Sequence, residues 1–339
     1  MIDWSRGITA RYYASIINPS TWRDESTIDI ISGSIKYTNS GIRGSADLEC
    51  SKIDHNKEYW IRIYLEANQD GAGELVPLFT GIASSPDTTY NGRMYNSKVQ
   101  CYSVLSPAEK IYLPLGWFAR AGTSGGSVIK DLLSEHIPAP IVLEDGSPAL
   151  TSDVIAEKNE TRLSMVDKIL EAINWRIILF GNGTIKIAPK SSDQITANFD
   201  YETNDVFEMN VTVSNNWYDV PNVFRAVGQG ISSVAKDEDP NSKYSIPNRG
   251  REIWMQETDC ILNKGEKISQ YASRKLKEAQ NVNKTIDYTR RFIPEIHISD
   301  YVYLNYPEQN INGIFVIESQ DINLKYAGQV SEQVKGGVF

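Results

Sequence analysis

The stretch that decides the architecture of this chain is WRIILFGNGTIKIA, residues 175–188. Two isoleucine-rich runs flank Gly181-Asn182-Gly183, and strand-like runs around a tight glycine turn predict a β-hairpin. Immediately before the hairpin, apolar residues recur at helical spacing, which predicts an amphipathic helix over residues 160–174. The middle of the chain is therefore an α/β arrangement.

The segment on the N-terminal side of this helix extends the α/β unit. Residues 122–126, GTSGG, lead into apolar residues at helical spacing between Val128 and Ile137, which predicts another helix. A loop with several prolines follows from Pro138 to Pro148. We therefore predict a small α/β insert domain over residues 105–204.

The first hundred residues show strand patterns. Residues 60–66 alternate, with isoleucine or leucine at 61, 63 and 65 and more polar side chains at 62, 64 and 66, which predicts a half-buried strand. Asn91-Gly92 lies between two further strand-like runs and predicts a hairpin. Five or six short strands at this spacing predict a compact antiparallel barrel or sandwich over residues 1–104.

Strand patterns return after the α/β insert. They cover residues 205–214 and 222–230, and later 284–292, 300–306 and 313–324. Between them lie a polar stretch and a helix, for which Asn263 with Glu266 three residues on predicts a capping box. We predict a second β-barrel from residues 205–230 and 283–339, interrupted by an insert with a loop and a helix at 231–282.

Composition restricts the class of protein. The chain has 339 residues, 41% of them apolar and 23% charged, which is typical of a folded globular protein. No apolar run is long enough for a transmembrane helix, and the N-terminus does not resemble a secretion signal. The net charge of −9, with 34 basic and 43 acidic residues, argues against nucleic acid as a specific partner.

Cys50, Cys101 and Cys260 lie far apart in the sequence. Buried free thiols are the simpler interpretation, and a disulfide between two of them is the alternative. An odd number of cysteines without a CxxC spacing indicates synthesis in a reducing compartment.

Patterns that carry catalysis or metal binding do not occur. His55, His136 and His297 are isolated from one another, and the sequence has no HExxH and no Cys/His spacing typical of zinc sites. A nucleophilic triad also needs histidine beside serine or cysteine. We therefore predict no catalytic, cofactor-binding or metal-binding residue, no cofactor and no enzymatic activity.

Two loops and the aromatic content have functional alternatives. Gly122–Ser127 precedes a helix but lacks the Gly-Lys-Ser/Thr of a phosphate-binding loop, so a glycine-rich helix start is the simpler interpretation. Asp237-Glu238-Asp239 lacks the spacing of an EF-hand, which favours a solvated loop. Phe, Trp and Tyr make up 10% of the chain, and strand packing explains them at least as well as sugar binding does.

The order of these segments resembles the hub proteins of contractile phage tails and phage-tail-like bacteriocins, the late-control D family. Residues 78–83 are similar to an F-x-G-x-I strand of that family, and residues 269–279 to its A-x-x-x-L-x-E helix. Ser299 stands where the family's I-x-x-G-D-x-V strand usually has glycine. The segments that carry the resemblance are residues 28–37, 44–50, 78–83, 98–105, 160–170, 175–188, 221–228, 269–279, 296–302 and 313–319.

The resemblance implies a β-rich α+β fold with two tail-tube-like antiparallel β-barrels, a small α/β insert domain and a second helical insert. It implies a homotrimer that links a six-fold tail tube to a three-fold spike. The implied partners are the tail tube protein, a spike or puncturing tip, other baseplate proteins and the tape-measure protein. The implied location is the baseplate of a particle assembled in the bacterial cytoplasm, without membrane insertion by this chain.

Two other functions stay open from the sequence. One is the hub portion of a tail-associated peptidoglycan hydrolase, which requires a catalytic domain in addition to these residues. The other is a carbohydrate-binding tail module that recognises a host surface.

Overall fold

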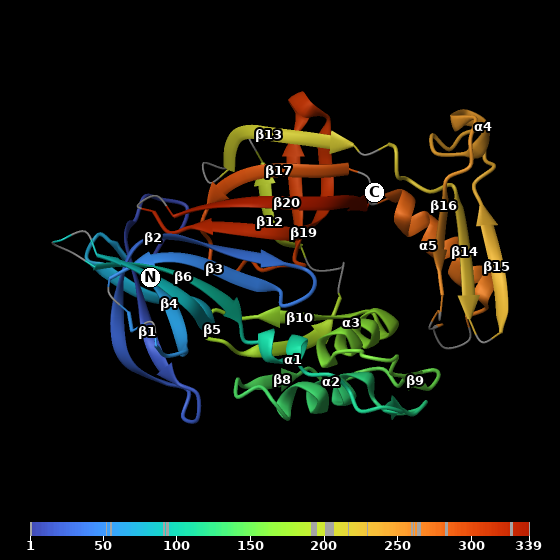
Figure 1. The fold of residues 1–339 in the computed structure, drawn as a ribbon. Helices are drawn as coiled ribbons and strands as arrows, with labels where there is room; N and C mark the ends of the chain where they lie inside the picture. The colour runs from blue at the N-terminus through green and yellow to red at the C-terminus, as the bar shows by residue number, and fades with distance from the viewer. Residues whose placement is uncertain are drawn as a thin grey trace.

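The computed structural model describes residues 2–51, 53–54, 56–90, 92, 95–190, 195–200, 207–215, 217–228, 230–258, 260, 262, 266–281, 284–325 and 328–338. Antiparallel strands dominate these residues, which confirms the predicted β-rich class. Figure 1 shows an N-terminal β body (blue) beside a second β body (yellow to red), with a mixed α/β unit below and a small α/β unit at the far side. No helix among the described residues is long and apolar enough to cross a membrane.

Six strands form the first β body. They are β1 (Thr9–Asn18), β2 (Arg23–Thr38), β3 (Gly44–Cys50), β4 (Tyr59–Gln69), β5 (Ala72–Tyr90) and β6 (Tyr95–Ser103). Their order is β1-β4-β5-β6-β3-β2, and β1 also pairs with β2, so these strands close into a barrel. The interior is filled by side chains such as Ile35, Ile63 and Phe79. Tyr90 pairs with Tyr95, as the Asn91-Gly92 hairpin requires, although Asn91 itself lies outside the described residues.

The second β body also has six strands. They are β12 (Ile195–Asp200), β13 (Phe207–Asn215), β17 (Lys284–Arg291), β18 (Tyr301–Tyr306), β19 (Ile311–Asn323) and β20 (Gln329–Val338), with a 3-10 turn, η1, at Pro307–Gln309. Their order is β12-β18-β19-β20-β17-β13, and in the described part of the chain β12 and β13 do not pair with each other. This body is therefore open, and its long strand β19 pairs with β2 of the first barrel.

The first insert lies between the two bodies in sequence. Its elements are α1 (Ser106–Lys110), β7 (Phe118–Ala119), α2 (Gly125–Ser134), β8 (Ile141–Leu143), β9 (Val154–Ile155), α3 (Arg162–Ile173), β10 (Trp175–Leu179) and β11 (Ile185–Pro189). The predicted helix and hairpin are both present. Thr161 caps α3 through a bond from the Ser164 amide, and Asn174 ends it with a φ of 56°. β10 and β11 pair from Trp175 onward.

The second insert forms a sheet of its own. Its elements are β14 (Val223–Gly228), β15 (Ile231–Lys236), α4 (Ile246–Arg249), β16 (Trp254–Glu257) and α5 (Ile268–Asn281). The sheet order is β15-β14-β16, and α5 covers one face through contacts among Phe224, Tyr271 and Leu276. The predicted cap Asn263 lies outside the described residues.

The strand pairing differs from the predicted division at two places. β12 pairs with β18 of the second body, although residues 195–200 were assigned to the first insert. β14 pairs with β15 and β16, although residues 222–230 were assigned to the second barrel. The reason is physical: a strand pattern indicates that a segment is extended, but the choice of neighbour depends on which edge is available.

Candidate functional site

The described histidines do not form a reactive centre. His136 lies 3.8 Å from the neighbouring Glu135 carboxylate. His297 places Nδ1 2.9 Å from the Glu295 carbonyl oxygen, and burial lowers its pKa despite the nearby Asp300 carboxylate. His55 lies outside the described residues. Within the described ranges, no group of three or more His, Cys, Asp or Glu residues is placed to hold a metal ion.

The glycine-rich segment before α2 is used for packing. The Gly125 amide donates to the Pro148 carbonyl at 2.9 Å, and the Gly126 amide donates to the Ser147 hydroxyl at 2.7 Å. A Cβ on Gly126 would come within 2.6 Å of Leu143. These helix-start amides are thus bound by protein acceptors, which is what a structural helix start requires and a phosphate cradle does not.

The acidic loop before α4 is tied to its own insert. The Asp237 carboxylate accepts bonds from the Ser242 hydroxyl at 2.5 Å and from the Gln280 amide at 2.9 Å. The Asp239 carboxylate accepts a bond from the Asn241 amide at 2.9 Å. These carboxylates fix the loop and fasten it to α5.

All three cysteines are buried free thiols, so the disulfide alternative is wrong. Burial raises the pKa of Cys50 to about 11 and raises that of Cys101 still further. Burial also raises the pKa of Cys260. Thiols that stay protonated are poor nucleophiles, and here they serve as small apolar side chains.

The hairpin turn at 181–183 binds the wall of the first barrel. The carbonyl oxygen of Asn182 accepts bonds from the Arg62 guanidinium at 3.0 Å and from the Trp22 indole at 3.1 Å. The carbonyl oxygen of Gly181 accepts a bond from the Thr80 hydroxyl at 2.7 Å. The first insert is therefore attached to the barrel through its most recognisable turn.

Glycine is required in this turn because the two backbones nearly touch. A Cβ on Gly181 would lie 1.8 Å from the Pro77 carbonyl oxygen of β5. Gly183 has a φ of +86°, and a Cβ there would lie 2.6 Å from the Trp22 ring. The sequence predicted the turn correctly, but the docking surface on the barrel was missed.

The same contact corrects the prediction for residues 60–66. Arg62 and Tyr64 lie on the face predicted to be polar and solvated, yet they are only 8% and 9% exposed. The hairpin covers this face, and Asp24 accepts bonds from both side chains, at 3.1 Å from Arg62 and 2.6 Å from Tyr64. β4 is thus largely buried on both faces, with a charged pair at the contact between barrel and insert.

The second β body carries a charge pair in its interior. Arg290 on β17 and Glu332 on β20 are 1% and 2% exposed, and two nearly parallel bonds of 2.9 and 2.6 Å join them. The Tyr288 hydroxyl donates to Glu332 at 2.5 Å, and the Gln320 amide donates to Glu332 at 2.6 Å. Burial and the Glu332 charge raise the pKa of Tyr288 well above its ordinary value. This satisfied network specifies the register of three adjacent strands.

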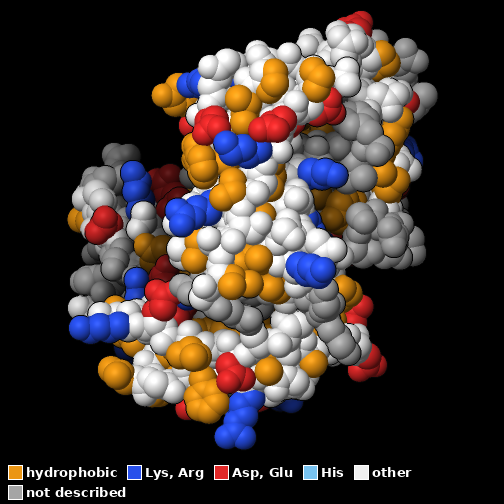
Figure 2. Space-filling view, turned by 90° about the vertical axis from the view of Figure 1, so that its right-hand side faces the viewer, with side chains coloured by type: hydrophobic (Ala, Val, Ile, Leu, Met, Phe, Trp, Pro, Cys, Tyr) orange, Lys and Arg blue, Asp and Glu red, His pale blue; other side chains and the backbone are white. Residues whose placement is uncertain are grey.

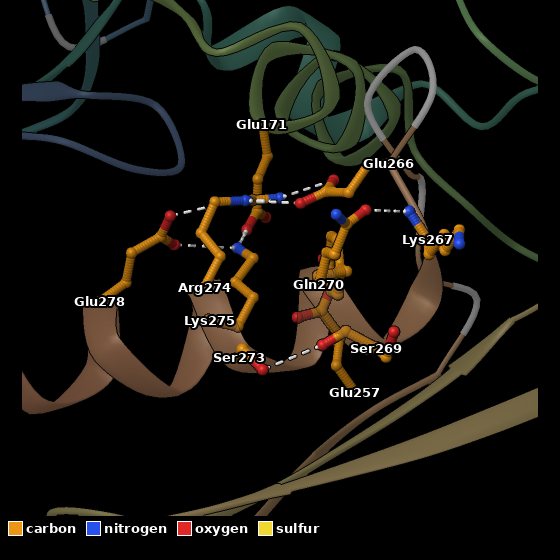
Figure 3. A network of polar contacts seen from close by, with 11 residues as sticks. Glu171, Glu257, Glu266, Lys267, Ser269, Gln270, Ser273, Arg274, Lys275 and Glu278 are labelled. Carbon is orange, nitrogen blue, oxygen red and sulfur yellow. Dashed lines mark hydrogen bonds and ion pairs between the residues drawn. The ribbon is translucent and has the colours of Figure 1, made fainter.

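An ion pair joins the two inserts, as Figure 3 shows. Lys275 on α5 reaches across to Glu171 on α3 at 2.5 Å, while Arg274 binds Glu266 and Glu278 within the second insert. Burial by itself raises the Glu171 pKa, but the hydrogen bond and charge of Lys275 outweigh it, so the pKa of Glu171 lies below its ordinary value. This contact is more exposed than the docked hairpin, because Glu171 keeps 64% of its side chain in solvent.

The features that remain available to partners are strand edges. In the described part of the chain, β13 pairs only with β17, and β12 only with β18. Ile195 on β12 is an apolar side chain that is 42% exposed. An unpaired edge with an exposed apolar residue is a template for another strand, so the candidate functional site is an assembly surface.

Ser299 supports the alignment with the tail-hub pattern. Its φ is +65°, in the left-handed region that favours glycine, and its hydroxyl donates to the Asn39 side chain. The position therefore has the backbone conformation that explains the family's usual glycine.

Solved structures similar to this chain in fold include two tail proteins and a type VI secretion component. The tail protein from Neisseria meningitidis MC58 matches 96% of each chain at 14% identity and a TM-score of 0.71. The 43 kDa tail protein of prophage MuSo2 from Shewanella oneidensis matches 96% of this chain and 98% of its own, at 11% identity and a TM-score of 0.68. A type VI secretion component of E. coli, described as similar to bacteriophage T4 tail proteins gp27 and gp5, matches 92% of this chain and 74% of its own, at 8% identity and a TM-score of 0.53.

No protein-family model matches the chain, and no curated protein is significantly similar to it in sequence. The likeness is therefore one of fold. It confirms the tail-protein fold predicted from the order of the segments.

Proposed function

We propose that this chain is the structural hub of a contractile-tail or tail-like baseplate, in which three copies link a six-fold tube to a three-fold spike. The observation that carries the proposal is the pair of six-stranded β bodies joined through β2 and β19. Three chains then supply six β bodies to one ring, which matches a six-fold tube above and a three-fold spike below. The tail proteins that share this fold support the same assignment.

The free edges give a mechanism for assembly. β12 and β13 each have one strand neighbour in the described ranges, so a strand edge of the next copy can pair with either. Main-chain hydrogen bonds then continue from one chain to the next, and no additional fold is needed to close the ring. Among its described residues the closed first barrel has no such edge between its own strands, so it contributes its outer surface.

The proposed role is mechanical. The hub contacts the tail tube protein, the spike or puncturing tip and other baseplate proteins, including the tape-measure protein, without chemistry of its own. A net charge of −9 suits a ring through which DNA passes, because phosphates are repelled instead of held.

Native mass spectrometry and electron microscopy of the isolated chain test this function. We expect a species of three times the 38.1 kDa chain mass and a ring with a central channel. Ile195→Lys, on the free-edge strand β12, should shift the protein to monomers because a buried ammonium opposes strand pairing. Ile231→Lys is the matched control, since Ile231 is 55% exposed on the second insert. A stable monomer, or a chain that cleaves purified cell wall, would overturn the proposal.

A further inference from the structure

A groove lies between the second insert and the rest of the molecule. Its volume is about 510 Å³, within the range of roughly 300–1,000 Å³ that ligand sites occupy. One wall is formed by β16 and α5 of the second insert, and the other by α3 and by Thr285 and Lys335 of the second β body. Figure 1 shows β16 on the side of its sheet that faces the second β body.

The wall formed by β16 is incompletely covered. α5 packs over β14 and β15, so the α5-facing side chains of β16, Met255 and Glu257, border the groove. Met255 is 47% exposed and lies opposite the buried Phe224 across the β14–β16 pair. The groove therefore has an apolar floor at the edge of a sheet.

The main chain of β16 is also available at this edge. The Ile253 carbonyl accepts bonds from the Asn222 and Val223 amides at 3.1 Å, so it points toward β14. Because successive residues of a strand point their N–H and C=O groups to opposite sides, Trp254 and Gln256 point theirs away from β14. In the described part of the chain, β16 has no neighbour on that side.

Charge indicates what the groove accepts. Four carboxylates border it, from Glu171, Asp219, Glu257 and Glu278, against the ammonium groups of Lys275 and Lys335. Lys275 pairs with Glu171 at 2.5 Å, Arg274 pairs with Glu278 at 2.8 Å, and Lys335 approaches Glu318, outside the groove, at 3.6 Å. Glu257 accepts a bond from the Tyr271 hydroxyl at 2.5 Å, and carboxylates still outnumber ammonium groups on the lining. The groove is thus negative over an apolar floor. Figure 2 shows that the outer side of this part of the molecule instead mixes hydrophobic, basic and acidic side chains.

We propose that this groove binds an extended segment of another protein that alternates apolar residues with lysine or arginine, added as a fourth strand on β16. The segment's main chain pairs with Trp254 and Gln256, its apolar side chains cover Met255, and its cations face the carboxylates. This inference goes beyond the hub assignment and does not depend on trimerisation, because the groove is built within one chain.

Fluorescence anisotropy with labelled peptides tests the proposal. The probes are a capped peptide of alternating lysine and valine and its glutamate–valine counterpart. We expect saturable binding of the lysine peptide that weakens at high salt, and at least tenfold weaker binding of the glutamate peptide. Equal binding of both probes, or no binding of the lysine peptide, would overturn the proposal.

Three variants locate the site. Met255→Lys should weaken binding at least tenfold, because it adds a cation to the floor. Gln256→Pro should do the same, because it removes an edge amide that does not serve the β14 pairing. Ile231→Lys should bind as the unmodified chain does, since Ile231 lies on β15, at the opposite edge of the sheet. Thermal melts establish that each variant is folded.

Two further results would overturn the proposal. One is dimerisation of the chain that Met255→Lys abolishes, which would make a second copy the ligand. The other is weakening by Ile231→Lys equal to that by Met255→Lys, which would place binding elsewhere. Retention of the trimer in all variants, with loss of peptide binding only in the groove variants, separates this inference from the hub assignment.

Discussion

The two β bodies have the same number of strands but treat their edges and their buried arginines differently. The first closes on itself through β1 and β2, and its Arg62 binds the hairpin turn of the first insert. In the described part of the chain the second has no pairing between β12 and β13, and its Arg290 is neutralised inside the sheet by Glu332. The closed body uses its charge to hold a neighbouring unit, whereas the open body uses its charge to fix its own strands.

In the proposed function, this difference lets one architecture serve two tasks. A barrel without free edges can offer its wall as a docking surface without risking strand exchange. An open sheet that pairs with another chain must keep its register before that chain arrives, because a shift of one residue inverts its faces. A buried, fully hydrogen-bonded ion pair provides that specificity.

We expect the largest effect from removing the internal charge of the open body. Glu332→Ala leaves the Arg290 guanidinium buried without a counter-charge, and we expect a loss of about 3–5 kcal/mol in the free energy of unfolding. Urea denaturation measures this loss. The double variant Arg290→Met/Glu332→Leu is the control and should recover most of it, because neither charge then remains buried. A loss below about 1 kcal/mol for the single variant would contradict the assigned role.

The next effect concerns the docked hairpin of the first barrel. Gly181→Ala places a Cβ 1.8 Å from the Pro77 carbonyl oxygen, so the turn must shift away from the wall. We expect a destabilisation of about 1–3 kcal/mol, as for overpacked sites, and a change in the fluorescence of Trp22, which binds this turn. Gly7→Ala is the matched control, since a Cβ there meets nothing within 4 Å. Equal melting temperatures for both variants would show that the hairpin is not held.

A smaller effect distinguishes how the two inserts are attached. Lys275→Met removes the bridge to Glu171. Because Glu171 is 64% exposed, we expect the free energy of unfolding to fall by at most about 1 kcal/mol at neutral pH. Lys277→Met, at an exposed position of the same helix, should change nothing. The urea midpoints of the three proteins measure both expectations.

The pH dependence of the same bridge follows from the carboxyl pKa. Since folding lowers the pKa of Glu171 below 4.5, the bridge contributes stability above that pH and loses it as the pH falls through the folded value. The difference in the free energy of unfolding between the unmodified chain and Lys275→Met should therefore shrink on acidification below about pH 4.5. A difference that stays constant to pH 3 would exclude an ionic contribution.

The smallest effect concerns how often each part of the molecule opens locally. Cys260 lies in the small core of the second insert, whereas Cys50 and Cys101 lie in the closed barrel. A thiol reagent should modify Cys260 first, because a small unit opens more often than a closed barrel. Mass mapping after timed labelling measures the order, and faster labelling of Cys101 would contradict it.

Local chemistry made much of the fold predictable. The α3 helix with its Thr161 cap and the β10–β11 hairpin depend on short-range spacing and turn residues, and both were correct. Ser299 sits in a left-handed conformation that agrees with the glycine of the resembling family. The isolated histidines and the lack of zinc-site spacings led to the prediction of an assembly protein without a reactive centre.

Which segments meet depends on the tertiary structure. Arg62 stands at a polar position of an alternating strand, and nothing local indicates that Gly181 and Asn182 would cover it from more than a hundred residues away. The partners of β12 and β14 likewise depend on which sheet edges are free once the chain is compact. Sequence by itself determined the elements, since propensity and turns act over a few residues. The closed barrel, the open edges and the groove at β16 depend on long-range packing, which no short segment encodes.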